Sequence, residues 1–262
     1  MLPIQRHQRI LEMLEREPVV TVGQMAQQLN VAESTIRRDL DTLEAEGHVK
    51  RTFGGAVLSP SRPAIEEPAC LELEQKVTHQ EAKEQIARAA AAMIADNEAV
   101  FLDSGTTTAR IVPHILDRQG LTIVTCDLNI AVCLSRSPNI STVVIGGELH
   151  VPTLSFTGLL AQKAMELFDL NFSKAFIGAR GVAAAYGITN RVSERIPLKR
   201  LAIQRAREVI VVADGSKIGM LAPSQVAPIT STTYLITDAS APAAERAAIA
   251  GQGVKVIVVD VG

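Results

Sequence analysis

Residues 34–58 read STIRRDLDTLEAEGHVKRTFGGAVL, a helical pattern followed by two short strand-like runs around a Gly-Gly turn. At 100° per residue, Ile36, Leu40 and Leu43 lie within about 60° of one another, which predicts one buried helix face. The opposite face is polar and carries two arginines near its N-terminal end. This stretch therefore predicts an amphipathic helix that leads into a β-ribbon.

Two further helices are predicted upstream of this stretch. Residues 5–17 carry apolar side chains on one helical face and end before Pro18. Residues 21–24 read TVGQ, which has the form of a capping box and begins a short second helix. Three helices followed by a ribbon predict a winged helix-turn-helix, with the recognition helix at residues 34–46 and the wing at residues 48–58.

The outward faces of this recognition helix and wing carry the candidate DNA contacts. Serine, threonine and arginine in the first turns of such a helix contact bases and phosphates, and glycines let a ribbon turn tightly. Asp39 lies near the buried face, and we expect it to pair with a nearby arginine rather than with a base. The candidates for DNA contact are Ser34, Thr35, Arg37, Arg38, Lys50, Arg51, Gly54 and Gly55.

The charge of this region leaves an alternative open. Residues 1–60 hold seven Lys or Arg and eight Asp or Glu, a net charge of −1 with histidine neutral. The basic side chains must therefore gather on one face if the region binds DNA. A protein-interaction or dimerisation module is the alternative, and the bunching of arginine and lysine on the helix and wing favours DNA.

A change of composition divides the chain. Residues 59–68 read SPSRPAIEEP, and the three prolines interrupt any helical or strand period. At 262 residues the chain is long enough for two domains. We expect a DNA-binding domain at residues 1–58, a linker at 59–75 and a second domain at 76–262.

The second domain is predicted to be an α/β domain built on a mostly parallel sheet. Short, continuously apolar runs alternate with helical stretches, which is typical of strands covered on both faces. Strands are expected at 99–102, 121–124, 142–145, 175–177, 209–212, 234–237 and 254–259, and helices at 80–95, 107–117, 159–168, 197–206 and 243–250.

Polar residues follow several of these strands, and the carboxyl ends of parallel strands meet at a ligand crevice. The small, hydroxyl-rich loop at 103–108 is typical of a phosphate site; ordinary helix capping is the alternative. It is neither a dinucleotide loop nor a P-loop, so no nucleotide cofactor is expected. The candidates for ligand binding at strand ends are Asp103, Ser104, Gly105, Thr106, Thr107, Thr125, Gly147, Glu148, Asp214 and Lys217.

The motifs of both halves resemble one family. TIRRDL at 35–40, Leu43-Glu44, Gly47 and R-x-x-GGA at 51–56 resemble the signature of the DeoR family of bacterial transcription regulators. In the second half, D-x-GTT at 103–107, GGE at 146–148, FIG at 176–178 and D-x-SK-x-G at 214–219 resemble the effector domain of that family. The resemblance spans nearly the whole chain.

The resemblance implies a winged helix-turn-helix that reads operator DNA, joined to a sensor of phosphorylated sugars. The fold of that sensor is similar to ribose-5-phosphate isomerases and CoA transferases. It also adds ligand-binding candidates: Lys199 matches a recurrent lysine, and Glu194 and Arg195 stand where the family has an acidic pair. We hypothesise that the reversed charge at Arg195 suits a more acidic ligand. Cys126 and Ser173 also depart from the family pattern.

The sequence thus predicts a DNA-binding regulator, a repressor of a sugar or sugar-derivative catabolic operon, acting as a homodimer or homotetramer. No catalytic residue and no cofactor is expected. The alternative is a sugar-phosphate isomerase or transferase-like enzyme that carries a DNA-binding module. Turnover of a sugar phosphate by the purified protein distinguishes the two.

Composition bounds the remaining classes. Hydrophobic residues make up 47% of the chain and charged residues 21%, which excludes a disordered polymer. The five histidines are scattered, so no metal site is expected. No apolar run reaches the roughly 18 residues that span a membrane, and no signal-peptide pattern precedes Arg6, so we expect a cytoplasmic protein without a membrane partner.

Overall fold

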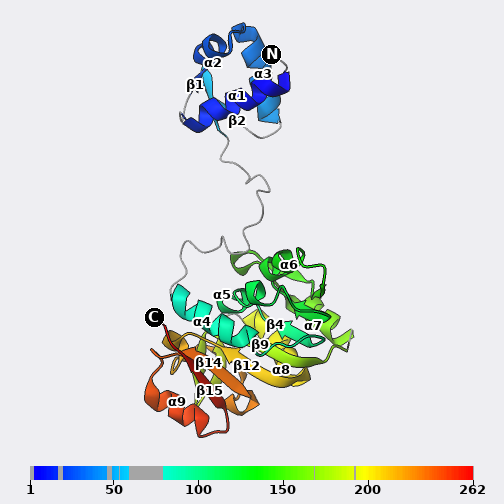
Figure 1. The fold of residues 1–262 in the computed structure, drawn as a ribbon, viewed down its shortest axis with the longest axis vertical. Coiled ribbons are helices and arrows are strands. Elements are labelled where there is room, and N and C mark those ends of the chain that lie inside the picture. The colour runs from blue at the N-terminus through cyan, green and yellow to red at the C-terminus, as the bar shows by residue number, and fades with distance from the viewer. Residues whose placement is uncertain are drawn as a thin grey trace. The chain divides into compact units, whose positions relative to one another are not determined.

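The computed structural model describes residues 3–16, 20–45, 49–52, 54–58, 79–167, 169–191 and 193–261. The chain divides into two compact units, Met1–Glu67 and Pro68–Gly262 (Figure 1). The predicted linker at 59–75 lies outside the described residues. Each unit is described by itself.

The first unit is a winged helix-turn-helix. Its strands form an antiparallel sheet in the order β1-β3-β2, and its core holds Ile10, Met25, Ile36 and Leu40, all without exposed surface. The predicted helices and wing are confirmed, and a short strand before the second helix extends the sheet. The elements are α1 (Pro3–Arg16), β1 (Val20–Thr21), α2 (Val22–Leu29), α3 (Glu33–Ala45), β2 (Val49–Thr52) and β3 (Gly55–Leu58).

Local signals in the sequence account for both ends of α2. The predicted capping box is present: the Thr21 hydroxyl accepts the N–H of Gln24, and the Gln24 side chain accepts the N–H of Thr21 at 2.8 Å. At the other end Asn30 adopts a left-handed conformation with φ of 51°, and its N–H donates to the last turn. Asparagine tolerates this conformation better than most residues, which ends the helix there.

A buried ion pair joins α1 to the recognition helix α3. The Arg6 guanidinium donates to both carboxylate oxygens of Asp39, with 2.9 Å from Nη2 to Oδ1, and Asp39 also contacts His7 at 3.1 Å. The expected pairing of Asp39 with an arginine is therefore confirmed. Burial raises the pKa of Asp39, but hydrogen bonds from Arg6 and His7 outweigh burial and hold that pKa below its usual value.

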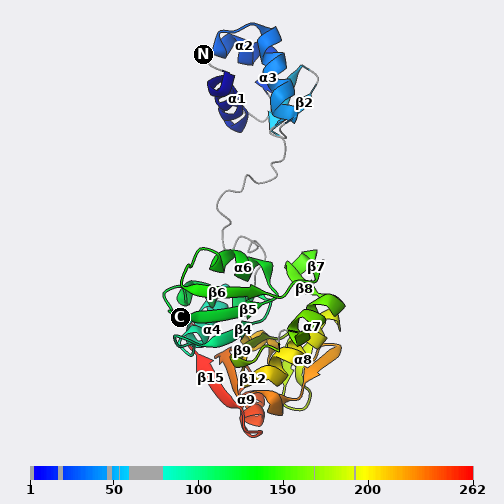
Figure 2. The same ribbon diagram turned by 90° about the vertical axis from the view of Figure 1, so that its right-hand side faces the viewer.

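The second unit is built on a seven-stranded parallel sheet in the order β15-β14-β12-β9-β4-β5-β6 (Figure 2). Each strand predicted from an apolar run is present, so the predicted fold class is confirmed. The strands are β4 (Ala99–Leu102), β5 (Leu121–Thr125), β6 (Ile140–Val144), β9 (Phe172–Gly178), β12 (Ala206–Val212), β14 (Tyr234–Asp238) and β15 (Lys255–Val259).

Helices cover both faces of this sheet. Apolar side chains of α4 and α6 share one core with the strands, and those of α7 and α8 share the core on the opposite face. A third core joins α9 to the smaller strands. The helices are α4 (Gln80–Ala91), α5 (Thr106–Ala109), α6 (Leu128–Leu134), α7 (Gly158–Leu167), α8 (Ile196–Arg205) and α9 (Ala243–Ala250).

Two predicted features differ in the structure. The single helix expected at 107–117 is split into α5 and a 3₁₀ turn at Val112–His114, which contains Pro113 and its missing N–H. Helix α6 was not expected, because Asp127, which caps it, stood in a segment interpreted as a ligand loop.

Smaller strands that the sequence did not predict complete the unit. They form a three-stranded antiparallel sheet and a two-stranded hairpin. None of the helices in the described residues is long and apolar enough to cross a membrane. The strands are β7 (Glu148–His150), β8 (Ser155–Thr157), β10 (Gly181–Ala183), β11 (Gly187–Asn190) and β13 (Ser224–Ala227).

Candidate functional site

A cavity of about 330 Å³ lies at the carboxyl edge of the parallel sheet. Its walls come from the segments that follow β4, β9 and β12 and from the start of α8. These strands are neighbours in the sheet, so their polar carboxyl ends meet at one place. The fold therefore creates a polar pocket where an α/β sheet usually binds its ligand.

The loop between β4 and α5 forms one wall of the cavity. Ser104, Gly105, Thr106, Thr107 and Thr108 all line it. Gly105 has φ of 154°, a conformation that side chains rarely adopt, and the Thr108 hydroxyl donates to its carbonyl oxygen at 2.9 Å. The hydroxyls of Thr106 and Thr107 are left as potential donors to a bound anion.

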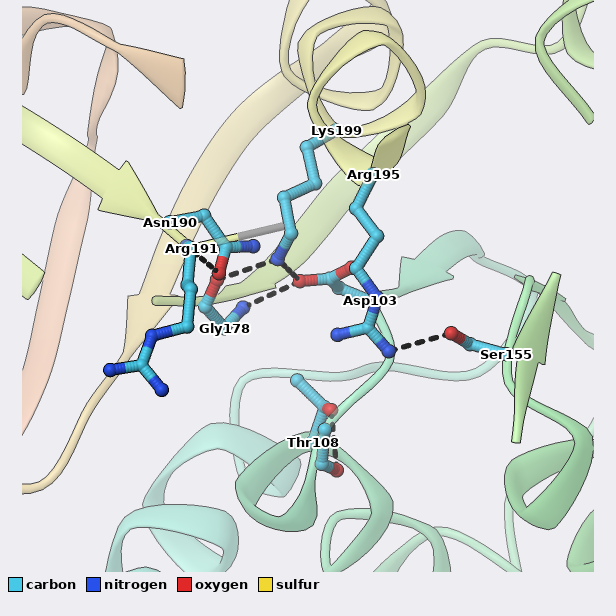
Figure 3. A network of polar contacts seen from close by, with 9 residues as sticks. Asp103, Thr108, Ser155, Gly178, Asn190, Arg191, Arg195 and Lys199 are labelled. Carbon is cyan, nitrogen blue, oxygen red and sulfur yellow. Dashed lines mark hydrogen bonds and ion pairs between the residues drawn. The ribbon is translucent and has the colours of Figure 1, made fainter. Parts of the chain in front are cut away.

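A buried ion pair forms the floor between β4, β9 and α8 (Figure 3). Lys199 donates to the carboxylate of Asp103 and to the carbonyl oxygen of Gly178 at 2.7 Å. The N–H of Gly178 donates to the same Asp103 oxygen at 2.9 Å. Asp103 is 2% exposed and Lys199 3%. The two opposite charges therefore neutralise each other where water has little access.

Arg195 reaches across the cavity from the start of α8, four residues before Lys199 (Figure 3). Its Nη2 donates to the hydroxyl of Ser155 in β8 at 2.6 Å. Its Nε is buried and has no hydrogen-bond partner among the described residues. A buried guanidinium nitrogen without a partner is costly, so this donor is suited to a bound acceptor.

Cations outnumber carboxylates in the lining. Beside Lys199, whose charge Asp103 neutralises, the described lining residues include a single carboxylate, that of Asp214, and four further cations: Lys83, Arg180, Arg195 and Lys217. The Asp214 carboxylate is buried and caps the turn at Gly215–Lys217, where it accepts the N–H of Ser216 at 3.2 Å. The pocket therefore has the electrostatics of an anion site.

The buried thiol of Cys126 is not a nucleophile. Burial raises the pKa of Cys126 to about 12, and the carboxylate of Asp103 adds to the shift. The thiol is therefore neutral at physiological pH. No group of His, Cys, Asp and Glu suited to a metal ion occurs among the described residues.

A second polar surface lies on the first unit. On α3, Ser34, Arg37 and Arg38 are exposed, and Arg37 pairs with Glu33 at 2.8 Å. In the part of the chain that the structure describes, Arg38 forms no ion pair. The first turns of the helix thus present hydroxyl and guanidinium groups outward.

The wing is joined to this helix by its arginine. The Arg51 side chain pairs with Asp41, and the Arg51 N–H donates to Glu44 at 2.8 Å. Lys50 is exposed. The ribbon is therefore held against the second half of α3.

Both halves of the chain match models of one family. The DeoR-like helix-turn-helix domain matches residues 6–62, and the DeoR C-terminal sensor domain matches residues 78–239. The chain belongs to the DeoR family. The resemblance seen in the motifs is thereby confirmed, and the chain is a DNA-binding transcription regulator of the DeoR type.

Individual proteins agree with this assignment. The HTH-type transcriptional regulator FruR of Bacillus subtilis is 35% identical over 240 residues, which cover 91% of this chain and 92% of that protein. The lactose phosphotransferase system repressor of Lactococcus lactis is 31% identical over 214 residues, or 81% of this chain and 82% of that protein. Both are named as regulators and not as enzymes, as predicted for this chain.

Solved structures are more distant. Ribose 5-phosphate isomerase A of Methanocaldococcus jannaschii is 16% identical and covers 53% of this chain and 55% of its own, with a TM-score of 0.40. A likeness at this level supports no statement about function.

The DeoR-type sensor brings together most of the predicted ligand residues. Asp103 lies beneath Lys199 rather than on the cavity surface. The predicted residues that line the cavity are Ser104, Gly105, Thr106, Thr107, Arg195, Lys199, Asp214 and Lys217.

Four predicted residues besides Asp103 do not line the cavity. Thr125 is fully buried at the end of β5, where its hydroxyl accepts the N–H of Asp127 at 3.1 Å. Gly147 lies so close to β8 and α7 that an added Cβ would be 2.6 Å from the carbonyl oxygen of Thr157 and 2.9 Å from the Cβ of Ala161. Glu148 is exposed in β7, and Glu194 is exposed at the 3₁₀ turn before α8.

Sequence reasoning missed several lining residues. Lys83 lies on the buried side of α4 among alanines, and a lysine in an apolar stripe is a signal that was available. The others stand beside predicted loops or in the unpredicted strand β11 and offered no clear signal. The missed residues are Lys83, Thr108, Gly178, Ala179, Arg180, Asn190, Val212 and Ala213.

The two wing glycines have different structural roles. Gly54 is exposed with φ of 89°, a turn conformation that glycine adopts without strain. Gly55 is buried in β3, where a Cβ would lie 2.3 Å from the carbonyl oxygen of Val20. Gly55 therefore lets β1 and β3 approach, which is a reason for glycine that does not involve DNA.

Proposed function

We propose that this DeoR-type regulator is a repressor of a sugar or sugar-derivative catabolic operon, and that a phosphorylated sugar in the cavity changes its affinity for operator DNA. The observation that carries the proposal is the excess of cations around a hydroxyl-rich loop at the sheet edge. The relationship to a lactose phosphotransferase system repressor supports the carbohydrate class. Because bacterial operator DNA is in the cytoplasm, we assign the site of action to that compartment.

The cavity suits a phosphorylated sugar in both charge and hydrogen bonding. Lys217 supplies a point charge for a phosphate, and the hydroxyls of Thr106 and Thr107 supply donors. The carboxylate of Asp214 accepts hydrogen bonds from sugar hydroxyls. A volume of about 330 Å³ is at the lower end of ligand pockets, which fits a small metabolite.

Operator binding is assigned to the outward face of α3 and to the wing. The exposed groups of Ser34, Arg37 and Arg38 lie in the first turns, where a recognition helix contacts bases and phosphates. Lys50 and Arg51 in the wing are assigned to the phosphate backbone, since lysine and arginine there contribute affinity without reading sequence.

A single winged helix binds DNA weakly, so we assign a homodimer or homotetramer that grips repeated half-sites. Exposed apolar side chains on the sensor support self-association. Val151, Leu159 and Leu160 are each more than 60% exposed, on or beside β7, β8 and α7. Light scattering after size-exclusion chromatography measures the mass of the assembly.

The testing experiment is fluorescence anisotropy of the full chain on DNA from upstream of its own gene, at fixed salt, with and without phosphorylated sugars. A ligand shifts binding only if it prefers one of the two conformations. One compound that changes operator affinity tenfold supports the proposal. Salt-sensitive DNA binding that no compound changes overturns the sensor assignment, and binding that salt does not weaken overturns the operator assignment.

The matched variants separate the two activities. Lys217→Met is expected to abolish the response to the sugar and to leave basal DNA affinity within twofold. Arg38→Ala is expected to weaken DNA binding and to leave sugar binding, measured by calorimetry, unchanged. Arg207→Gln, an exposed arginine on β12 outside the cavity, serves as the control for both.

A further inference from the structure

The cations of the cavity lie at two separate places. Lys217 follows β12, whereas the Arg195 guanidinium contacts Ser155 in β8. The backbone of Ser155 in turn forms an isolated β-bridge with the backbone of Asp127, which follows β5. The Lys217 end and the Arg195 end of the pocket are therefore attached to different strands of the sheet.

The sheet order gives the scale of this separation. The order β12-β9-β4-β5 places three strand spacings between β12 and β5. Adjacent strands lie about 4.8 Å apart, so the two strand ends are roughly 14 Å apart before side chains reach inward. The loop at 104–108 follows β4, which lies between these two strands, so the cavity runs from Lys217 past this loop to Arg195.

The Arg195 end holds one buried carboxylate, that of Asp127, which forms no ion pair with Arg195 in the described residues. Arg195 forms no ion pair within the described residues, and its buried Nε has no partner. The buried carboxylate of Asp127 accepts the N–H groups of Gly105, Asn129 and Ile130 instead. Asp103 is already paired with Lys199.

We infer that Arg195 forms a second anion subsite, so that the effector is a phosphorylated sugar carrying a further anionic group at the end away from its phosphate. This inference rests on the proposed function, in which Lys217 and the loop at 104–108 hold the phosphate. The added group is a carboxylate or a second phosphate. Planar guanidinium suits both, because it donates two parallel hydrogen bonds to either.

The test uses calorimetry of the full chain with pairs of sugars that differ only in the second anion. Glucitol 6-phosphate is paired with 6-phosphogluconate, which carries a carboxylate in place of the C1 alcohol. Fructose 6-phosphate is paired with fructose 1,6-bisphosphate, and ribose 5-phosphate with ribose 1,5-bisphosphate, which add a phosphate. The doubly anionic member of at least one pair is expected to bind tenfold or more tightly than its partner, and the pair concerned distinguishes carboxylate from phosphate.

Substitutions of Arg195 test whether this side chain is responsible for the preference for doubly charged sugars. Arg195→Gln is expected to remove the tenfold difference while changing the affinity for the singly charged member by less than threefold. Arg195→Lys keeps the charge without the planar donors and is expected to retain part of the preference, which also shows that the site tolerates substitution. Lys217→Met is expected to weaken the binding of both members of a pair alike. Arg207→Gln is expected to change the binding of neither member.

Failure of this inference differs from failure of the proposed function. If singly and doubly charged members bind wild-type protein equally, or if Arg195→Gln keeps the preference, the second subsite is wrong and the sensor assignment stands. If no member of any pair binds, the sensor assignment is wrong and the subsite with it.

Discussion

The two units of this regulator differ in how two of their cations are neutralised. On the DNA-binding unit, Arg37 pairs with Glu33 and Arg51 with Asp41. In the sensor cavity, Arg195 and Lys217 form no ion pair within the described residues. We propose that the ion pairs of the first unit moderate attraction to DNA, whereas the two cations of the cavity favour a small anion.

Each unit also contains one buried ion pair, and the two differ in position. Arg6 and Asp39 join α1 to α3 inside the first unit. Lys199 and Asp103 lie at the cavity, where the lysine also lines the ligand space. The same chemistry therefore stabilises the fold in one unit and lies at the proposed binding site in the other.

The largest effect is expected from Lys199→Met. It leaves the Asp103 carboxylate buried without its cation, a loss of about 3–5 kcal/mol in comparable buried pairs. Effector binding is expected to disappear as well. Hydrogen exchange measured by mass spectrometry should show faster exchange in β4 and β9 and unchanged exchange in α1–α3. Unchanged effector affinity would contradict the role given to this pair.

Asp39→Ala is the matching change in the first unit, with an expected loss of about 3 kcal/mol, because it removes the buried carboxylate to which the Arg6 guanidinium donates. Exchange should rise in α1 and α3, operator binding should fall, and effector binding should not change. Asp41→Ala is the control, because its pair is exposed and contributes less than about 1 kcal/mol.

The Asp39 pair also predicts a pH dependence. Its carboxyl has a pKa below the usual value, which is about 3.9, so the pair stabilises the unit fully above pH 4. That stabilisation is lost as pH falls through the lowered pKa. The protection of α1 and α3 against exchange, corrected for the slower intrinsic exchange of amides in acid, should therefore fall in acid in the wild type, and Asp39→Ala should lack this component.

The sequence predicts the elements of the sensor better than its site. Each strand of the large sheet is a continuous apolar run, and that signal survives without any knowledge of neighbours. The order of strands is not encoded locally. Gly147 and Glu148 follow β6, which lies at the sheet edge two strands from β4, and β7 pairs with β8 beside α7. They therefore stand away from the cavity although they follow a strand.

The side-chain contacts of both units were predictable only where the sequence carries a local signal. Asp39 could be assigned to an arginine because its place on the helix wheel put it near the buried face. Lys199 and Arg195 came from the family motif alone, since the contacts of Lys199 with Asp103 span 96 positions in the sequence. No local pattern links residues that far apart.

A moderate effect is expected from removing the unpaired arginine of α3. Arg38→Ala should weaken operator binding by about 1–3 kcal/mol, or roughly 5- to 150-fold, and reduce the salt slope by about one. Arg37→Ala should cost less, because the wild-type arginine already shares its charge with Glu33. Anisotropy over a salt series measures both. Equal losses for the two variants would remove the distinction between paired and unpaired arginines.

The smallest effect, and the most direct test of the contrast between the units, is expected from neutralising the acidic partners. Glu33→Gln and Asp41→Asn free Arg37 and Arg51 and remove negative charge facing DNA. Each should tighten operator binding two- to threefold at about 0.05 M salt, where the Debye length exceeds 10 Å. The gain should vanish near 1 M salt, because screening then acts at about 3 Å. Glu166→Gln, on α7 of the sensor, is the control and should change nothing. If the two acidic partners can be neutralised without any gain at low salt, the ion pairs on α3 and the wing do not moderate DNA affinity, and the cations of both units act alike.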